Sequence, residues 1–185
     1  MFGITPAHLH LLVNHIPVEG IMGSVLLLLY AILRNNAELK RTALLAFVLV
    51  GIAAFVADLT GDGAAGVAKH IPGVERAAIS AHSAAADTAR FVSYALAAVS
   101  LLGLILAWRT KEVEATNAIN AHDYVRHHKE PHKAIIILCL LIGLLDVYFF
   151  AMTAYKGGLI RHPEIESGFQ SQAPATAPAD TTQSE

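Results

Sequence analysis

Histidine is the residue type in this chain with the widest range of chemistry, and most of the ten histidines lie at the ends of apolar stretches. A neutral imidazole is the commonest metal ligand in proteins, and its second ring nitrogen needs a carbonyl or carboxylate partner. His8 and His15 are seven residues apart, which places them on one face of a helix that Glu19 continues. His82 lies within residues 77–86, where most of the other residues are Ala or Ser. Such small side chains allow close helix approach or leave room for a flat cofactor.

Four apolar stretches, residues 16–33, 42–59, 91–108 and 134–154, must position these histidines. A hydrocarbon core of about 30 Å needs about 20 helical residues, and helices satisfy their backbone groups within lipid. The chain is 55% hydrophobic and 15% charged, with a mean hydropathy of +0.51, whereas a soluble domain is about one quarter charged. The sequence therefore predicts an all-α bundle of four transmembrane helices in a lipid bilayer. The net charge of −2 gives no reason to expect a nucleic-acid partner.

Capping signals set the expected start of the first helix. Thr5 and Pro6 are typical of an N-cap followed by the first helical position, so this helix should run from about Pro6 to Leu33. Pro17 cannot donate a backbone hydrogen bond to Val13, which predicts a kink at the proline.

Composition sets the other expected boundaries. The glycine-rich residues 61–73 are expected to form a loop, and the third helix should begin at about Val74. Residues 1–166 are predicted to form the transmembrane domain, and residues 167–185 a disordered tail of Ala, Pro, Thr, Gln and Ser. The first seven residues hold no Lys or Arg, so we expect no cleavable export signal.

The basic residues predict the orientation of the chain in the membrane. The first and third connections carry Arg34, Lys40, Arg41, Arg109, Lys111, Arg126, Lys129 and Lys133. The opposite side carries Lys69, Arg76, Lys156 and Arg161. Because cytoplasmic loops are enriched in Lys and Arg, both termini should lie on the non-cytoplasmic side.

This orientation divides the histidines into two sets. The outer set contains His8, His10, His15, His70, His82 and His162, and the inner set contains His122, His127, His128 and His132. The outer set comes from every part of the chain that faces outward, so several of its members can converge. The inner set comes from a single connection. The outer face is therefore the better candidate for a site.

Helix rise gives the expected depth of each outer group. Counted from Arg34 and Arg109, His8 is 26 residues away and His82 is 27, whereas His15 and Arg90 are each 19 away. Straight helices would thus pair His8 with His82, about 10 Å outside the level of His15. His10 would lie on a different helix face from His8 and His15 unless the Pro17 kink redirects it. The same kink could also bring His15 to the level of His82, so a His15–His82 pair is the alternative.

Two charged residues within the apolar stretches need partners. Asp146 lies in the middle of the fourth stretch, where a charge is costly. Asp146 is expected to be protonated or hydrogen-bonded to the third helix. The candidate partners there are Ser93, Tyr94 and Ser100. Its role could be in packing or in a proton relay, and the sequence favours neither. Arg90 should pair with an acidic group, either Asp87, Asp58 or a cofactor carboxylate. The single cysteine, Cys139, excludes an intrachain disulfide and is expected to be buried.

One pattern of residues is shared with a known family. The segment His10-Leu-Leu-Val-Asn-His15-Ile-Pro17, the histidine at His82, and Gly157-Gly158 followed by His162 resemble a family of small four-helix bacterial membrane proteins that is described as a domain of unknown function. The resemblance covers about residues 8–165 and implies a multi-pass protein of the bacterial inner membrane. Leu11 and Ile16 stand where the family signature has proline and phenylalanine.

The sequence hypothesis is a b-type haem protein that transfers electrons, as a subunit of a larger redox complex with membrane or periplasmic partners, rather than a stand-alone enzyme. His15 and His82 are the first candidates for haem or metal ligands, and His8 is the next metal candidate. Further cofactor-binding candidates are His10, His162 and Arg90. The chain has no Cys-x-x-Cys-His motif, which excludes covalent c-type haem. A structural or assembly subunit without a cofactor and a copper or zinc handling protein are the alternatives.

Overall fold

The computed structural model describes residues 3–117 and 131–165, except for the side chains of residues 109–117. This part of the chain is helical and contains no strand. The elements are α1 (Pro6–Val13), α2 (His15–Leu33), α3 (Ala37–Ala68), α4 (Arg76–Asn117), α5 (Lys133–Leu159) and the 3₁₀ turn η1 (Pro163–Ile165). The predicted tail and three of the predicted inner histidines (His122, His127 and His128) lie outside the described residues.

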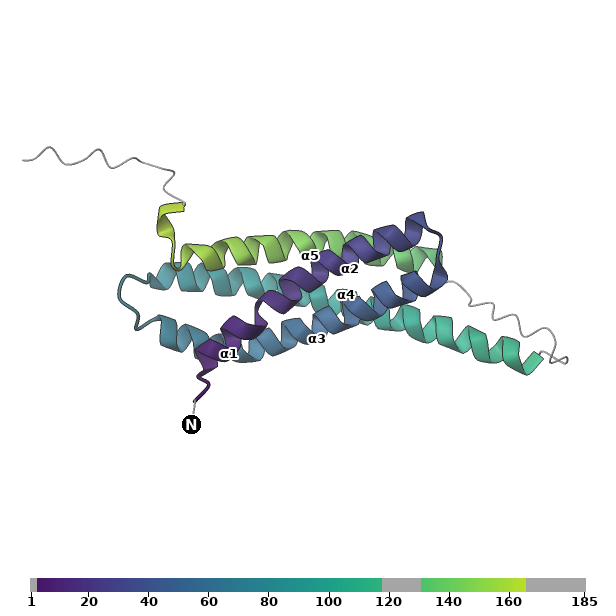
Figure 1. The fold of residues 1–185 in the computed structure, drawn as a ribbon, viewed down its shortest axis with the longest axis horizontal. Helices are drawn as coiled ribbons and strands as arrows, with labels where there is room; N and C mark the ends of the chain where they lie inside the picture. Colours follow the sequence, from purple (N-terminus) through teal and green to yellow (C-terminus); the bar gives the residue numbers. More distant parts are fainter. Residues whose placement is uncertain (1–2, 118–130, 166–185) are drawn as a thin grey trace, which may run out of the picture.

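The described helices form four segments that are long and apolar enough to cross a membrane. These are Pro6–Leu33, which combines α1 and α2, and then Ala37–Ala68, Arg76–Trp108 and Lys133–Leu159. The predicted all-α fold with four helices able to span a membrane is confirmed. The helices run along one long axis, and α4 projects past the others at one end (Figure 1). At the opposite end lie the start of α1, the end of α3, the start of α4 and the end of α5.

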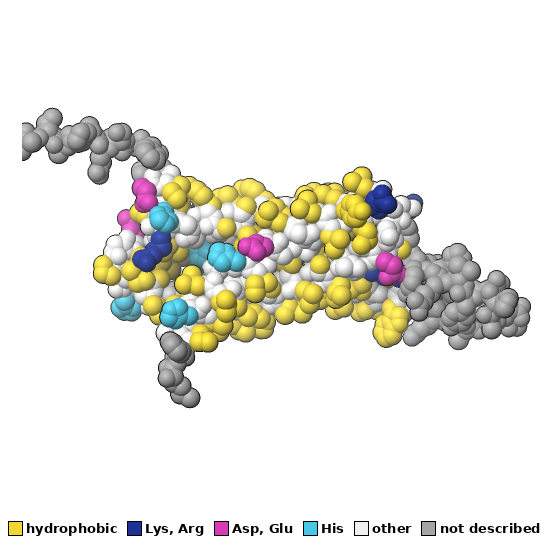
Figure 2. Space-filling view, in the orientation of Figure 1, with side chains coloured by type: hydrophobic (Ala, Val, Ile, Leu, Met, Phe, Trp, Pro, Cys, Tyr) yellow, Lys and Arg dark blue, Asp and Glu magenta, His cyan; other side chains and the backbone are white. Residues whose placement is uncertain are grey.

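We call this second end the histidine end. His8, His10, His70, His82 and His162 lie on the segments that form it. On the face of the molecule in Figure 2, every visible histidine lies in the half of the bundle that carries this end. Apolar side chains cover most of the length between the two ends, as expected of a surface that faces lipid.

The first membrane segment is broken, but not at the proline itself. α1 ends at Val13 and α2 begins at His15, so the break falls at Asn14. Pro17 lies in the first turn of α2, where a missing N–H group costs nothing. The lost bond to Val13 therefore appears as a break three residues before the proline, and the predicted position of the kink was wrong by that amount.

The glycine-rich segment is helical, so the predicted loop over residues 61–73 was wrong. α3 continues to Ala68, and the connection to α4 covers only residues 69–75. Gly63 has a packing role instead of a turn role: a Cβ atom there would lie 2.6 Å from the Cβ of Pro6. Glycine thus lets α1 lie close against α3. The third membrane helix begins at Arg76, two residues later than expected.

The middle of the bundle is closely packed. Its fully buried side chains include Ile21, Leu28, Leu44, Phe47 and Leu96. Glycines permit this approach: a Cβ at Gly51 would lie 2.6 Å from Ala97, and one at Gly103 would lie 2.9 Å from Ile135. Without a hydrophobic driving force in lipid, such small-residue contacts are what hold membrane helices together.

Candidate functional site

His10 is fixed by α3. Its Nδ1 lies 3.1 Å from the carbonyl oxygen of Ala57 and 2.9 Å from Oγ1 of Thr60, whose hydroxyl itself donates to Ala57 at 2.8 Å. A carbonyl oxygen can only accept, so the neutral ring carries its proton on Nδ1. Its Nε2 then bears the lone pair that a metal would use.

His82 is fixed in the same manner by α5. Its Nδ1 donates to the carbonyl oxygen of Thr153 over 3.0 Å. Gly157, one turn further along α5, leaves room for the ring: a Cβ there would lie 3.2 Å from both Cε1 and Nδ1 of His82. The neutral ring therefore also has its lone pair on Nε2.

His10 and His82 lie on segments that form the histidine end. They belong to helices that are not packed together, since within the described residues no Cα of α1 lies within 8 Å of a Cα of α4 or α5. Each ring is instead held by a different neighbouring helix: α3 holds His10, and α5 holds His82. Neither Nε2 has a hydrogen-bond partner in the described part of the chain. The arrangement leaves two oriented imidazole nitrogens without a hydrogen-bond partner among the described residues.

The other histidine candidates lie apart from this pair. His15 is exposed on α2, and His8 is exposed with its Nδ1 2.9 Å from Oγ1 of Thr5. His162 follows α5 and forms an exposed contact of 3.0 Å with Glu164. The Glu164 backbone N–H and then the His162 side chain hold the pKa of that carboxyl below its usual range. Among the candidates, His10 and His82 are thus the two that a neighbouring helix holds, whereas straight-helix counting pointed His10 elsewhere and paired His82 with His8. α1 packs against α3, which accounts for the contacts of His10 with Ala57 and Thr60.

Arg90 lies two turns further along α4 than His82 and already has two acidic partners. It forms ion pairs with Asp58 on α3 and with Asp87 on its own helix. Two of the three partners expected from the sequence are therefore present. Three polar atoms in this part of the bundle are buried without a hydrogen-bond partner among the described residues, namely Asn14 Oδ1, Arg90 Nε and Tyr94 Oη.

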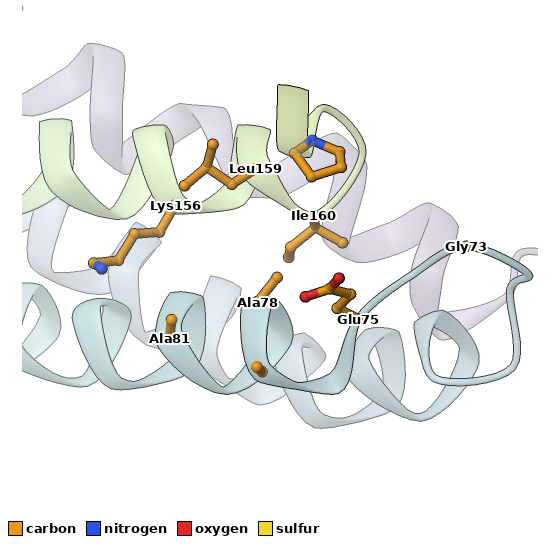
Figure 3. A pocket seen from close by; sticks show the side chains of 9 residues that line it. Gly73, Glu75, Ala78, Ala81, Lys156, Leu159 and Ile160 are labelled. Atoms are coloured by element: carbon orange, nitrogen blue, oxygen red, sulfur yellow. The ribbon is translucent and has the colours of Figure 1, made fainter. Parts of the chain in front are cut away.

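A half-open cavity of about 220 Å³ lies beside the first turns of α4. Ala78 and Ala81 form one wall, Lys156 on α5 and Ile160 directly after α5 form the other, and Glu75 lies at the edge (Figure 3). Within the described residues neither the Lys156 nor the Glu75 side chain has an ion-pair or hydrogen-bond partner. Ala81 adjoins His82 in the chain, and Lys156 adjoins Gly157, whose Cβ position lies 3.2 Å from the His82 ring. Only the alanine-rich composition of residues 77–86 signalled this space in the sequence.

Within the described residues no three His, Cys, Asp or Glu side chains are grouped so that they could hold a metal ion. The site is a pair of histidines rather than a cluster. No family model, curated protein or solved structure matches the chain.

Proposed function

We propose that this protein is a membrane b-type haem protein that transfers electrons, in which His10 and His82 would hold the haem iron. The observation that carries the proposal is that the two imidazole rings make the same kind of hydrogen bond. Each Nδ1 is held by a carbonyl oxygen of a neighbouring helix, and each Nε2 is free. Histidine ligands in metal sites commonly donate their second nitrogen in this way, which fixes both the tautomer and the ring plane.

The donor set favours haem over a structural metal ion. Two imidazoles from facing helices are a common way for a bundle to hold haem. A structural zinc ion needs four protein ligands, which is more than the histidine pair supplies. When bound, haem would supply a one-electron redox centre whose potential its axial ligands and surroundings tune.

Cationic side chains near the pair support the same assignment. Haem carries two carboxylates, which need donors or cations at the edge of the site. Arg90 is committed to Asp58 and Asp87. Lys156 lines the cavity beside Ala81 and has no partner within the described residues, so it is the better candidate to hold a haem carboxylate.

The position of the pair suggests how electrons would enter or leave. Both histidines lie near one end of the membrane-spanning segments, so the centre would serve a partner at that surface. In our proposal this is the non-cytoplasmic surface of a bacterial inner membrane, and the partner is another subunit of a redox complex. A cofactor-free structural subunit and a copper or zinc handling protein are the alternatives that the experiment must separate.

The test is a reduced-minus-oxidised absorption spectrum of the detergent-purified protein, with iron, copper and zinc measured on the same sample. A sharp α-band with one iron per chain is the expected result. A colourless protein that is folded and free of metal would leave the structural subunit, and stoichiometric copper or zinc without the band would leave the metal-handling protein.

A further inference from the structure

A second polar site lies in the middle of the bundle, separate from the histidine pair. The Asp146 side chain on α5 has no solvent-exposed surface. It lies at the α4–α5 interface, where Ser93 Oγ donates to its Oδ2 over 2.6 Å. Ser93 was one of the three partners expected from the sequence, so that part of the expectation is confirmed.

One oxygen of this carboxyl is unused. Oδ1 of Asp146 is buried and has no hydrogen-bond partner among the described residues. The nearby Gly143, one turn away on α5, faces Val25 and Phe47, so α2 and α3 present apolar side chains at this level. On the other side, the helix interface carries Ser100 and Cys139, whose side chains contact each other at 3.4 Å.

The charged and titratable groups on the helices that pack against α5 are engaged elsewhere or face outward. On α4, Arg90 is paired with Asp58 and Asp87. On α3, Lys40 donates to Asn35, and on α2, Glu19 is exposed. Tyr94 adjoins Ser93 in the chain, but its hydroxyl has no hydrogen-bond partner in the described part of the chain. No cation among the described residues is therefore within ion-pair distance of Asp146.

An ionised carboxylate in this position would have one neutral donor and no countercharge in a medium of low dielectric constant. A buried charge of this kind is far more costly than a buried neutral acid. We infer that Asp146 is a proton-binding site, whose carboxyl is held as a neutral acid with Ser93 as its positioning residue. Uptake forms an O–H bond on the carboxyl with a proton from water, and release returns that proton to water, with no electron transferred. The inference does not depend on haem.

The structure also sets a condition for release. The ionised Asp146 carboxylate becomes stable only when water or a cation reaches Oδ1. Proton exchange therefore requires α4 and α5 to separate at the level of Asp146. This predicts that the Asp146 proton exchanges with deuterium much more slowly than the proton of an acid at the surface.

Infrared spectroscopy of the full chain in lipid nanodiscs at neutral pH tests the inference. The wild-type protein should show the C=O band of a protonated carboxylic acid, and this band should shift slowly on transfer to D₂O. Asp146→Asn should remove the band completely. Asp62→Asn, which changes an exposed aspartate on α3, is the matched control and should leave it unchanged.

A second measurement needs no variant and covers the case in which Asp146→Asn does not fold. A hydrophobic carbodiimide reacts with protonated carboxyls in apolar surroundings, so mass spectrometry of treated wild-type protein should find the adduct on Asp146. An Asp146 without adduct, together with a wild-type spectrum that lacks the protonated C=O band, would overturn the inference.

Discussion

The middle and the histidine end of this bundle differ in the contacts that connect their helices. In the middle, apolar side chains such as Phe47 and Leu96 are fully buried, and glycines bring helices into direct contact. At the histidine end, α1 stays away from α4 and α5, and polar side chains reach across to backbone carbonyls of neighbouring helices. Close packing therefore supplies stability in one region, and in the other region hydrogen bonds to backbone carbonyls orient two imidazoles.

This difference predicts where substitutions should be tolerated and whether they should affect the stability of the bundle or the site. A substitution in the middle should act on the stability of the whole bundle. A substitution at the histidine end should act on the site and leave most of the stability in place. Variants of matched chemistry in the two regions can separate these effects.

The largest expected effect is on the packed middle. A Cβ at Gly51 would lie 2.6 Å from Ala97, so Gly51→Val must push α3 and α4 apart. Overpacking of this kind costs about 3 kcal/mol, which should appear as a lower unfolding temperature in detergent. Gly66 lies on the same helix with nothing within 4 Å of its Cβ position, so Gly66→Val is the control and should change stability little. Equal losses for the two variants would contradict the packing account.

The second effect also lies in the middle of the bundle, at the contact between Ser93 and Asp146. Ser93→Ala removes the one hydrogen bond that the Asp146 side chain makes in the described structure. Because a buried polar group is then left unpaired in lipid, we expect a loss of about 1–2 kcal/mol in the free energy of unfolding. Denaturation in mixed micelles measures it, with the exposed Ser83→Ala as the control. A loss no larger than that of Ser83→Ala would show that the bond contributes no stability.

The third effect is confined to the histidine end. Gly157→Ala places a Cβ 3.2 Å from the His82 ring, whereas Gly158→Ala meets nothing within 4 Å. We expect Gly157→Ala to weaken the bond from His82 to Thr153, at a cost of about 0.5–1 kcal/mol. Haem occupancy should fall in Gly157→Ala and stay at the wild-type level in Gly158→Ala. Spectra of the two variants that cannot be distinguished would argue against His82 as a ligand.

The smallest effect is at the exposed tip of this end. The pKa of Glu164 is lowered in the folded protein, so its contribution to stability is present above the ordinary glutamate pKa and is lost as pH falls through the lowered value. The groups are exposed, so Glu164→Gln should change the unfolding temperature only slightly at neutral pH and not at all in strong acid. Thermal scans at both pH values check this, with Glu75→Gln as the control. A larger difference in unfolding temperature between Glu164→Gln and the wild type in acid than at neutral pH would contradict this expectation.

The sequence predicted the architecture because hydropathy and length alone select membrane-spanning helices. It also predicted the pairing of Asp146 with α4 and of Arg90 with its acidic neighbours, since ionisable groups within apolar stretches have few partners to choose from. It failed at residues 61–68, which are helical and where Gly63 serves helix contact; of the glycines in residues 61–73, only Gly73 lies in the connection, with a positive φ. A single sequence does not distinguish these two uses of glycine.

The choice among the histidines could not be made from spacing. His8 and His15 share a helix face only if the helix is continuous, and it is broken at Asn14. His10 instead contacts Ala57 on α3, a residue 47 positions away in the chain. The free space near Lys156 is likewise set by where the end of α5 meets the start of α4. Both features are tertiary, so they lie beyond periodicity and composition.

The most direct test of the central claim compares haem content per chain in four proteins purified in parallel: wild type, His10→Ala, His82→Ala and His15→Ala. The account predicts about one haem in the wild type and in His15→Ala, and loss of haem from the other two while they remain folded. Retention of haem in His10→Ala together with its loss from His15→Ala would contradict the account.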